Sequence, residues 1–199
     1  MNYPAFYDAV EAITLHDPLS EALGAFEAGM VEWRYVDVVK CAGHSCPTIA
    51  GAYLMVREGL KALYKDEIPE RGAIKVSFRM PENEGTTGVV ANVFSLVTGA
   101  TSTWGFKGIG SQFNRTGLMA FEHAFPAHVK MQRIDTQACV ELTYDPSSIP
   151  PAQEMQPLFS KLLTQSLTQE EKKLFAQLWQ ERVRKILENF DRVIALKVY

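Results

Sequence analysis

The distribution of apolar residues predicts three long helices. The clearest covers residues 47–64, where apolar side chains recur at the three- and four-residue spacing of one helix face. These side chains are Ile49, Tyr53, Val56, Leu60 and Leu63. A second helix is expected over residues 85–101, ended by Gly99, and a third over residues 166–190. The third begins with Thr168 and Glu171 at capping-box spacing, and its apolar stripe must cover another part of the protein.

Strands are predicted where apolar and polar residues alternate or β-branched residues gather. Residues 32–40 have this pattern and are rich in valine and aromatic residues, and residues 73–80 precede Pro81. Further strands are expected at about 117–123, 128–134, 138–144 and 192–199. Two short helices should precede them, the second with Asp17 as N-cap and Pro18 in its first turn. Several strands in succession among helices predict an α+β fold, with a mixed or antiparallel sheet flanked by helices.

A change in composition divides the chain near residue 145. Four prolines fall within residues 145–157, which is typical of a linker or of the start of a new element. We therefore expect an α+β core domain at residues 1–145 and a C-terminal helical extension at residues 146–199.

Charge and cysteine content narrow the classes of function. The 199 residues carry a net charge of −3, so no basic surface indicates nucleic acid binding. No apolar run approaches the length of a membrane span, and the N-terminus lacks the pattern of a signal peptide. The 3 cysteines cannot all pair, which favours a reducing, cytoplasmic location. The expected partners are a small molecule and a second copy of the chain, without nucleic acid or membrane.

The densest candidate chemistry lies in CAGHSCPTIAG, residues 41–51. It places Cys41, His44 and Cys46 within six positions, with Cys46 at the expected N-cap of the 47–64 helix. A helix N-terminus stabilises a thiolate, the form needed for both metal binding and nucleophilic attack. Zinc accepts cysteine and histidine together, but a structural site needs a fourth ligand from elsewhere. A haem ligand, a thiol nucleophile and a merely structural turn remain alternatives.

The same residues carry a resemblance to a known family. GHSCPTIAG (43–51) resembles the Gly-His-x-Cys-Pro opening of FmdE-like proteins, named for the FmdE component of formylmethanofuran dehydrogenase. VTGATSTWGFKGIG (97–110) resembles the family's second motif. The resemblance implies an α+β domain, often dimeric, with a cleft around the His-x-Cys turn and a bound transition metal. It does not imply formylmethanofuran chemistry, because a fold does not fix a function.

The second motif departs from the family pattern. Where the family has Thr-Gly-Cys-Thr, this chain has alanine at Ala100. Asn92, a candidate ligand-binding residue, stands at an upstream position that is acidic in the family. By the resemblance, His44 and Cys46 are metal ligands, and Trp104 and Lys107 lie in the loop that matches the second motif. Trp104 either contacts a ligand in the cleft or serves to hold the loop. Cys41 joins the ligand set by proximity. The departures leave open whether the protein is an enzyme.

Two further histidines are candidate ligand-binding residues. His123 and His128 flank a short turn, and if residues 117–123 and 128–134 form a hairpin the imidazoles face each other. Solvated histidines at a loop tip are the alternative. Gly51 and Gly59 permit close approach of another backbone, either the domain's own sheet or a partner across a dimer interface.

The sequence thus predicts an FmdE-like protein that binds a transition metal, with zinc preferred. His44, Cys46 and Cys41 are the metal candidates, and a small ligand would occupy the adjoining cleft. The alternatives are a haem protein using the same cleft, and a thiol enzyme with Cys46 as nucleophile and His44 as base.

Overall fold

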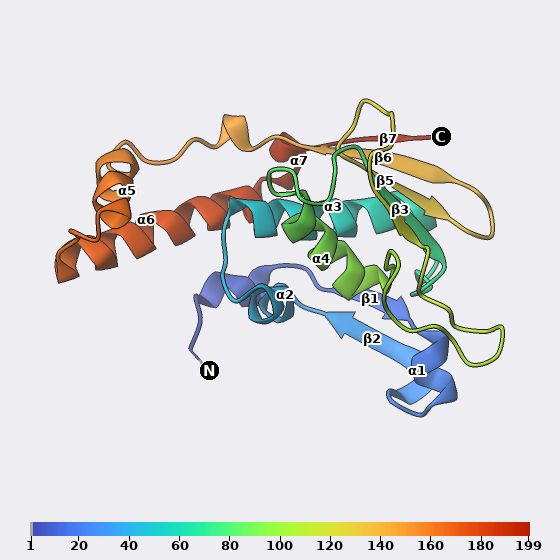
Figure 1. Cartoon of the computed structure of the whole chain (residues 1–199). Coiled ribbons are helices and arrows are strands. Elements are labelled where there is room, and N and C mark those ends of the chain that lie inside the picture. Colours follow the sequence, from blue (N-terminus) through green and yellow to red (C-terminus); the bar gives the residue numbers. More distant parts are fainter. Residues whose placement is uncertain (1) are drawn as a thin grey trace.

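The computed structural model describes residues 2–199 and contains two sheets on either side of a central helix (Figure 1). The larger sheet has five strands in the order β4-β3-β5-β6-β7, and only the β3–β4 pair is parallel. Its strands are β3 (Ile74–Phe78), β4 (Met119–Ala120), β5 (Val129–Arg133), β6 (Cys139–Tyr144) and β7 (Ile194–Val198). The smaller sheet pairs β1 (Ile13–His16) with β2 (Met30–Trp33). The predicted α+β class and the mixed sheet flanked by helices are confirmed.

The helices supply most of the core around these sheets. They are α1 (Pro18–Ala22), α2 (Tyr35–Ala42), α3 (Pro47–Tyr64), α4 (Thr87–Thr98), α5 (Met155–Leu163), α6 (Gln169–Glu188) and α7 (Phe190–Val193). Short 3₁₀ turns cover residues 5–9, 27–29 and 146–148. The predicted caps are confirmed: the Asp17 carboxylate accepts hydrogen bonds from the first turn of α1, and Thr168 and Glu171 form the capping box of α6.

Helix α3 lies across the large sheet and is buried on nearly every side (Figure 1). Its two glycines face that sheet. A Cβ atom on Gly51 would lie 2.4 Å from the ring of Tyr144, and one on Gly59 would lie 2.4 Å from the sulfur of Met131. The glycine spacing therefore serves close packing of α3 on the protein's own sheet.

Two predicted elements are wrong. Residues 32–40, expected as a strand, mostly form α2, because the Asp37 side chain accepts the Arg34 N–H at 3.1 Å and caps a helix whose apolar side packs on the core. The hairpin expected from residues 117–123 and 128–134 does not form. Instead β4 and β5 lie on opposite sides of β3, so the side chains of His123 and His128 do not face each other across a strand pair.

Residues 146–199 pack on the core mainly through the second half of α6 and through β7. Val183 and Ile186 of α6 are 0% exposed and pack in the same hydrophobic core as α3, while β7 completes the large sheet. The first half of α6 extends away from the two sheets with α5 packed beside it (Figure 1). We call this part of the chain, residues 155–178, the arm.

Candidate functional site

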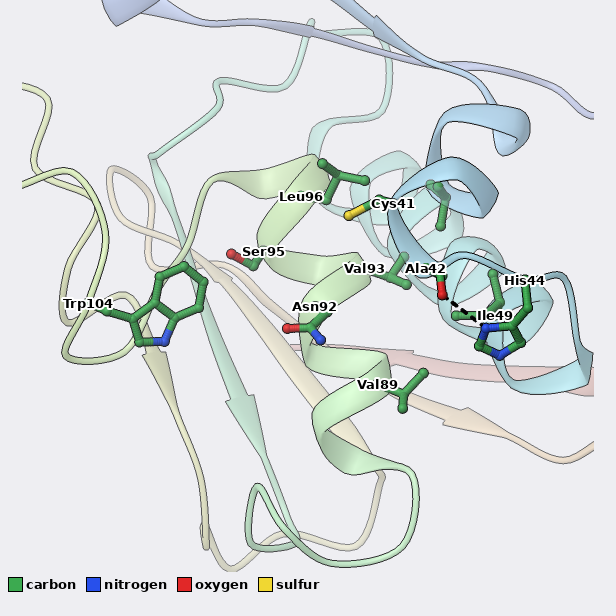
Figure 2. Close-up of a pocket in the computed structure, with 11 residues that line it drawn as sticks. Cys41, Ala42, His44, Ile49, Val89, Asn92, Val93, Ser95, Leu96 and Trp104 are labelled. Carbon is green, nitrogen blue, oxygen red and sulfur yellow. Dashed lines mark hydrogen bonds between the residues drawn. The ribbon is translucent and has the colours of Figure 1, made fainter. Parts of the chain in front are cut away.

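An apolar pocket lies where α2, α4, the start of α3 and the loop after α4 meet (Figure 2). Its volume is about 380 Å³, within the range of small-molecule sites. The residues that line it are Val38, Cys41, Ala42, His44, Ile49, Val89, Asn92, Val93, Ser95, Leu96 and Trp104. Most are apolar, and the thiol, imidazole, amide and hydroxyl groups among them are the polar contacts that it offers a ligand.

Two of the three predicted metal ligands reach this pocket through the end of α2. Cys41 lies in the last turn of the helix and is exposed. Gly43 then ends the helix with φ of 74°, a left-handed conformation that favours glycine, and its N–H donates to Val39. His44 follows, and its Nδ1 lies 3.0 Å from the Ala42 carbonyl oxygen (Figure 2). That contact fixes the ring and leaves Nε2 as the nitrogen available to a ligand.

The third predicted ligand, Cys46, has a different position. It is the N-cap of α3, as the sequence predicts, and its sulfur accepts the Ile49 N–H at 3.5 Å. Cys46 does not line the pocket that holds Cys41 and His44. The single side-chain hydrogen bond of His44 goes to Ala42, so the two partners proposed for a thiol enzyme are each bonded elsewhere.

The turn that carries these residues is held by the C-terminal helix. The Ser45 carbonyl accepts hydrogen bonds from Trp179 Nε1 at 2.9 Å and from Gln180 Nε2 at 3.2 Å. The buried Ser45 hydroxyl lies 2.9 Å from the hydroxyl of Tyr35. Burial raises the pKa of Tyr35, so its hydroxyl stays a neutral hydrogen-bonding group at physiological pH. The backbone between His44 and Cys46 is therefore fixed from both sides.

The donor chemistry of the pocket fits a transition metal, but the donor number is small. A thiolate and an imidazole are the ligands that zinc prefers, and Cys41 and His44 supply one of each. Across residues 2–199, no group of three or more His, Cys, Asp or Glu side chains lies close enough to hold a metal ion. A metal in this pocket would have two protein ligands, one fewer than a catalytic zinc site. The ligand role of Cys46 stays a prediction.

Helix α4 forms the opposite wall together with Trp104, which belongs to the segment that resembles the second family motif. Asn92 lies on α4 and, with Trp104 of the following loop, lines the pocket (Figure 2). Lys107, farther along that loop, is exposed and does not line the pocket. Ala100, at the position of the family's cysteine, is 0% exposed and does not line it either. A thiol there would face the core.

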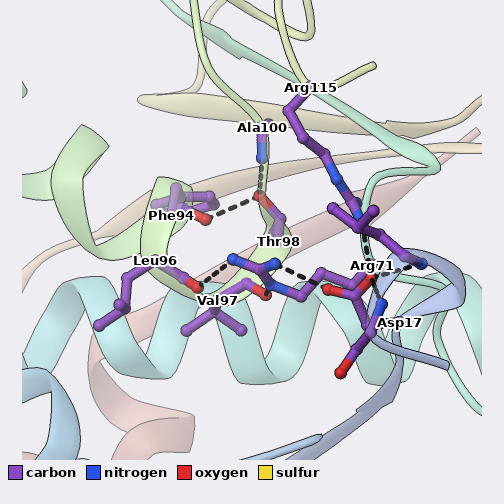
Figure 3. A network of polar contacts seen from close by, with 10 residues as sticks. Asp17, Arg71, Phe94, Leu96, Val97, Thr98, Ala100 and Arg115 are labelled. Atoms are coloured by element: carbon purple, nitrogen blue, oxygen red, sulfur yellow. Dashed lines mark hydrogen bonds and ion pairs between the residues drawn. The ribbon is translucent and has the colours of Figure 1, made fainter. Parts of the chain in front are cut away.

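A buried ion-pair network holds the Trp104 loop against α4 (Figure 3). Asp17 accepts hydrogen bonds from Arg71 at 2.8 Å and from Arg115, at the far end of the loop, at 2.7 Å. Arg71 also donates to the carbonyls of Leu96 and Val97 in the last turn of α4. Burial raises the pKa of Asp17, but the hydrogen bond from Arg71 and the charge of Arg115 outweigh it, so the pKa lies below its ordinary value.

The two remaining histidines lie in separate places. His123 is exposed and borders a shallow hollow on the outer face of the large sheet. His128 borders a second pocket of about 320 Å³ on the other side of α4, with Arg79 and Thr87. Burial, together with the charge of Arg79, lowers the pKa of His128, so its ring is neutral at physiological pH. Its Nδ1 accepts the Tyr144 N–H at 3.3 Å.

Sequence reasoning missed the residues that give the pocket its shape. Val93 and Ser95 of α4, and Val38 of α2, line it without belonging to any motif. Val38 could have been placed only by recognising the capping pattern of α2, which predicts a helix where the alternation of residues 32–40 predicts a strand. Ser95 carries no signal of its own, because its position depends on the packing of α4 beside α2.

Comparison with known proteins gives matches of structure but not of sequence. No family model and no curated protein matches the sequence. Among solved structures, the chain is similar to a tungsten formylmethanofuran dehydrogenase FmdE-like protein from Syntrophus aciditrophicus, with 16% sequence identity and a TM-score of 0.43. The match covers 84% of this chain and 72% of the other. The structural neighbour is an FmdE-like protein.

No helix of residues 2–199 is both long and apolar enough to cross a membrane.

Proposed function

We propose that this protein binds a small, largely apolar molecule in the pocket between α2 and α4. The observation that carries the proposal is the meeting of both sequence motifs in one apolar pocket, with Cys41 and His44 on one wall and Trp104 on the other. Residues from distant parts of the chain converge there, as expected for a binding site.

The lining residues define the chemistry of the ligand. Val38, Val89, Val93 and Leu96 offer apolar contact, and the half-exposed indole of Trp104 offers a flat surface for a ring. The polar groups of the lining are few, and no Asp, Glu, Lys or Arg side chain is among them. The pocket thus favours a compact molecule with one or two polar groups over a highly charged one.

A fluorescent probe tests the proposal. N-phenyl-1-naphthylamine is apolar and planar with one N–H group, and we expect its emission to rise on binding wild-type protein. Ser95→Phe places a ring inside the pocket and should weaken binding at least about tenfold. Val90→Phe is the matched control, because Val90 lies on the same helix but borders the second pocket, next to His128.

Comparing the two variants shows which pocket binds the probe. Weakened binding in Ser95→Phe and unchanged binding in Val90→Phe supports the proposal. Loss of binding in Val90→Phe alone, or no binding to wild-type protein, contradicts it.

Transition-metal binding is a second candidate function, favoured by one contact. Because Nδ1 of His44 faces the Ala42 carbonyl, Nε2 is the nitrogen left for a metal, in the same pocket as the exposed Cys41 thiol. A metal held there would polarise an oxygen or nitrogen atom of a bound small molecule as a Lewis acid. In this proposal Cys41 and His44 hold the metal, and Cys46 caps α3.

Cobalt provides a spectroscopic test of the metal proposal. We expect Co²⁺ titration to give a thiolate charge-transfer band in wild-type protein that is lost in Cys41→Ser and in His44→Gln. Cys46→Ser is the matched control and should keep the band, because Cys46 does not line the pocket. A band lost in Cys46→Ser and kept in Cys41→Ser would instead support Cys46 as the ligand. The absence of any band would contradict metal binding.

A further inference from the structure

Strand β7 is the last strand of the large sheet, and its outer edge has no neighbouring strand within residues 2–199 (Figure 1). Tyr199 and Cys139 exchange backbone hydrogen bonds, the Tyr199 N–H donating to Cys139 at 2.9 Å. In an antiparallel pair of strands, every second residue pair is hydrogen-bonded. Counting back from Tyr199, the next hydrogen-bonded residues of β7 are Lys197 and Ala195. The backbone N–H and C=O groups of Leu196 therefore point away from β6, toward the open edge.

The side chains along this edge are apolar and half exposed. Leu196 lies opposite Leu142 and Val198 lies opposite Val140, so both face the α3 side of the sheet. Yet Leu196 is 45% exposed and Val198 is 50% exposed, whereas their partners in β6 are both 0% exposed. Helix α3 contacts both strands but leaves these two side chains of β7 half exposed, and a hollow of about 420 Å³ borders Val198.

We propose that β7 pairs antiparallel with β7 of a second copy of this chain, about a twofold axis at Leu196. The two five-stranded sheets then form one continuous sheet. In this register Leu196 lies opposite Leu196 of the other copy, Ile194 opposite Val198, and Ala195 opposite Lys197. The interaction is β-strand addition between identical chains.

The backbone pattern fits this axis. Leu196 is a position whose N–H and C=O face outward, so the two copies exchange a reciprocal pair of hydrogen bonds across it. Val198 has the same orientation, and its N–H can donate to the carbonyl of Ile194 in the second copy. An axis at Ala195 or Lys197 would instead bring together backbone groups already bonded to β6.

The side chains fit a second copy as well. Lys197 meets Ala195 rather than another lysine, so like charges do not lie directly opposite each other. Glu141, beside Lys197 in β6, supplies a compensating charge on the same face. The apolar side chains of Leu196 and Val198 from each copy cover those of the other. Without such a partner, an exposed apolar edge strand is prone to aggregation.

Sedimentation equilibrium of the full chain tests the proposal. We expect wild-type protein at tens of micromolar to have twice the 22.3 kDa mass of one chain. Leu196→Pro removes an outward-facing N–H, which an edge strand tolerates, and should halve the mass without unfolding the protein. Leu163→Lys is the matched control, because Leu163 is exposed on the arm, a separate apolar surface that a partner could cover. It should leave the dimer intact.

A cross-link test does not depend on a disruptive variant. Leu196 is the one position in β7 that lies opposite itself, with Cα atoms about 5.5 Å apart in a bonded pair, which suits a disulfide. On mild oxidation with copper phenanthroline, Leu196→Cys should give a covalent dimer and Ala195→Cys should not exceed the wild-type background. A monomeric wild-type protein, a Leu196→Pro dimer, dissociation by Leu163→Lys, or cross-linking at position 195 alone would each overturn the proposal.

Discussion

Asp17→Ala should destabilise the protein by about 3–5 kcal/mol, the cost of removing one partner from a buried ion pair. Asp17 is 4% exposed and Arg115 is 5% exposed, so the substitution leaves a buried guanidinium without its counter-charge. It also removes the N-cap of α1. Urea unfolding followed by circular dichroism measures the change, and a loss below about 1 kcal/mol would contradict the role given to the pair.

Asp17→Asn separates the contribution of the negative charge to stability from that of the N-cap hydrogen bonds. Asparagine is a good N-cap, so this variant keeps the α1 contact while removing the negative charge beside Arg71 and Arg115. The folded-state pKa of Asp17 is lowered, so the ionised carboxylate contributes stability at pH values above its unfolded pKa. That contribution is lost as the pH falls through the folded pKa. We therefore expect the difference in stability between wild type and Asp17→Asn to be largest near neutral pH and to shrink in acid.

Ile186→Ala should destabilise the whole chain by about 2–5 kcal/mol, because it creates a cavity in a fully buried site. Ile186 is 0% exposed, on the half of α6 that packs against α3. Leu163→Ala is the matched control: Leu163 is 70% exposed on the arm, and its truncation should change stability by no more than about 0.5 kcal/mol. A single unfolding transition, shifted as a whole in Ile186→Ala, is the expected result.

The alternative result would be informative about domain organisation. If residues 146–199 unfold independently, Ile186→Ala would produce a second, earlier transition while residues 1–145 keep their stability. The packing of Ile186 with α3 in one core argues against separate transitions.

Features set by local sequence could be predicted. The N-caps at Asp17 and Cys46 and the end of α4 at Gly99 depend on side chains and backbone angles within one turn, and all three are confirmed. The helix predicted over residues 47–64 agrees with α3 because its apolar spacing is regular over five turns.

Features set by distant contacts could not be predicted. Residues 32–40 have a strand-like alternation, and only the Arg34–Asp37 cap and Gly43 indicate the helix that forms. The position of β4 beside β3, rather than beside β5, depends on a parallel pairing that no turn sequence specifies. For the same reason the sequence indicated Cys41 and His44 as one cluster and Trp104 separately, while the pocket that unites the three depends on how α2 packs against α4.

The bonds from Trp179 and Gln180 to Ser45 have a consequence for synthesis. They join residues 134 and 135 positions apart, so the turn between His44 and Cys46 cannot gain its final contacts until the second half of α6 has left the ribosome. For most of translation, the turn between His44 and Cys46 would lack the hydrogen bonds that Trp179 and Gln180 donate to Ser45. The candidate site is therefore among the last parts of this protein to mature, although its motif is among the first to be made.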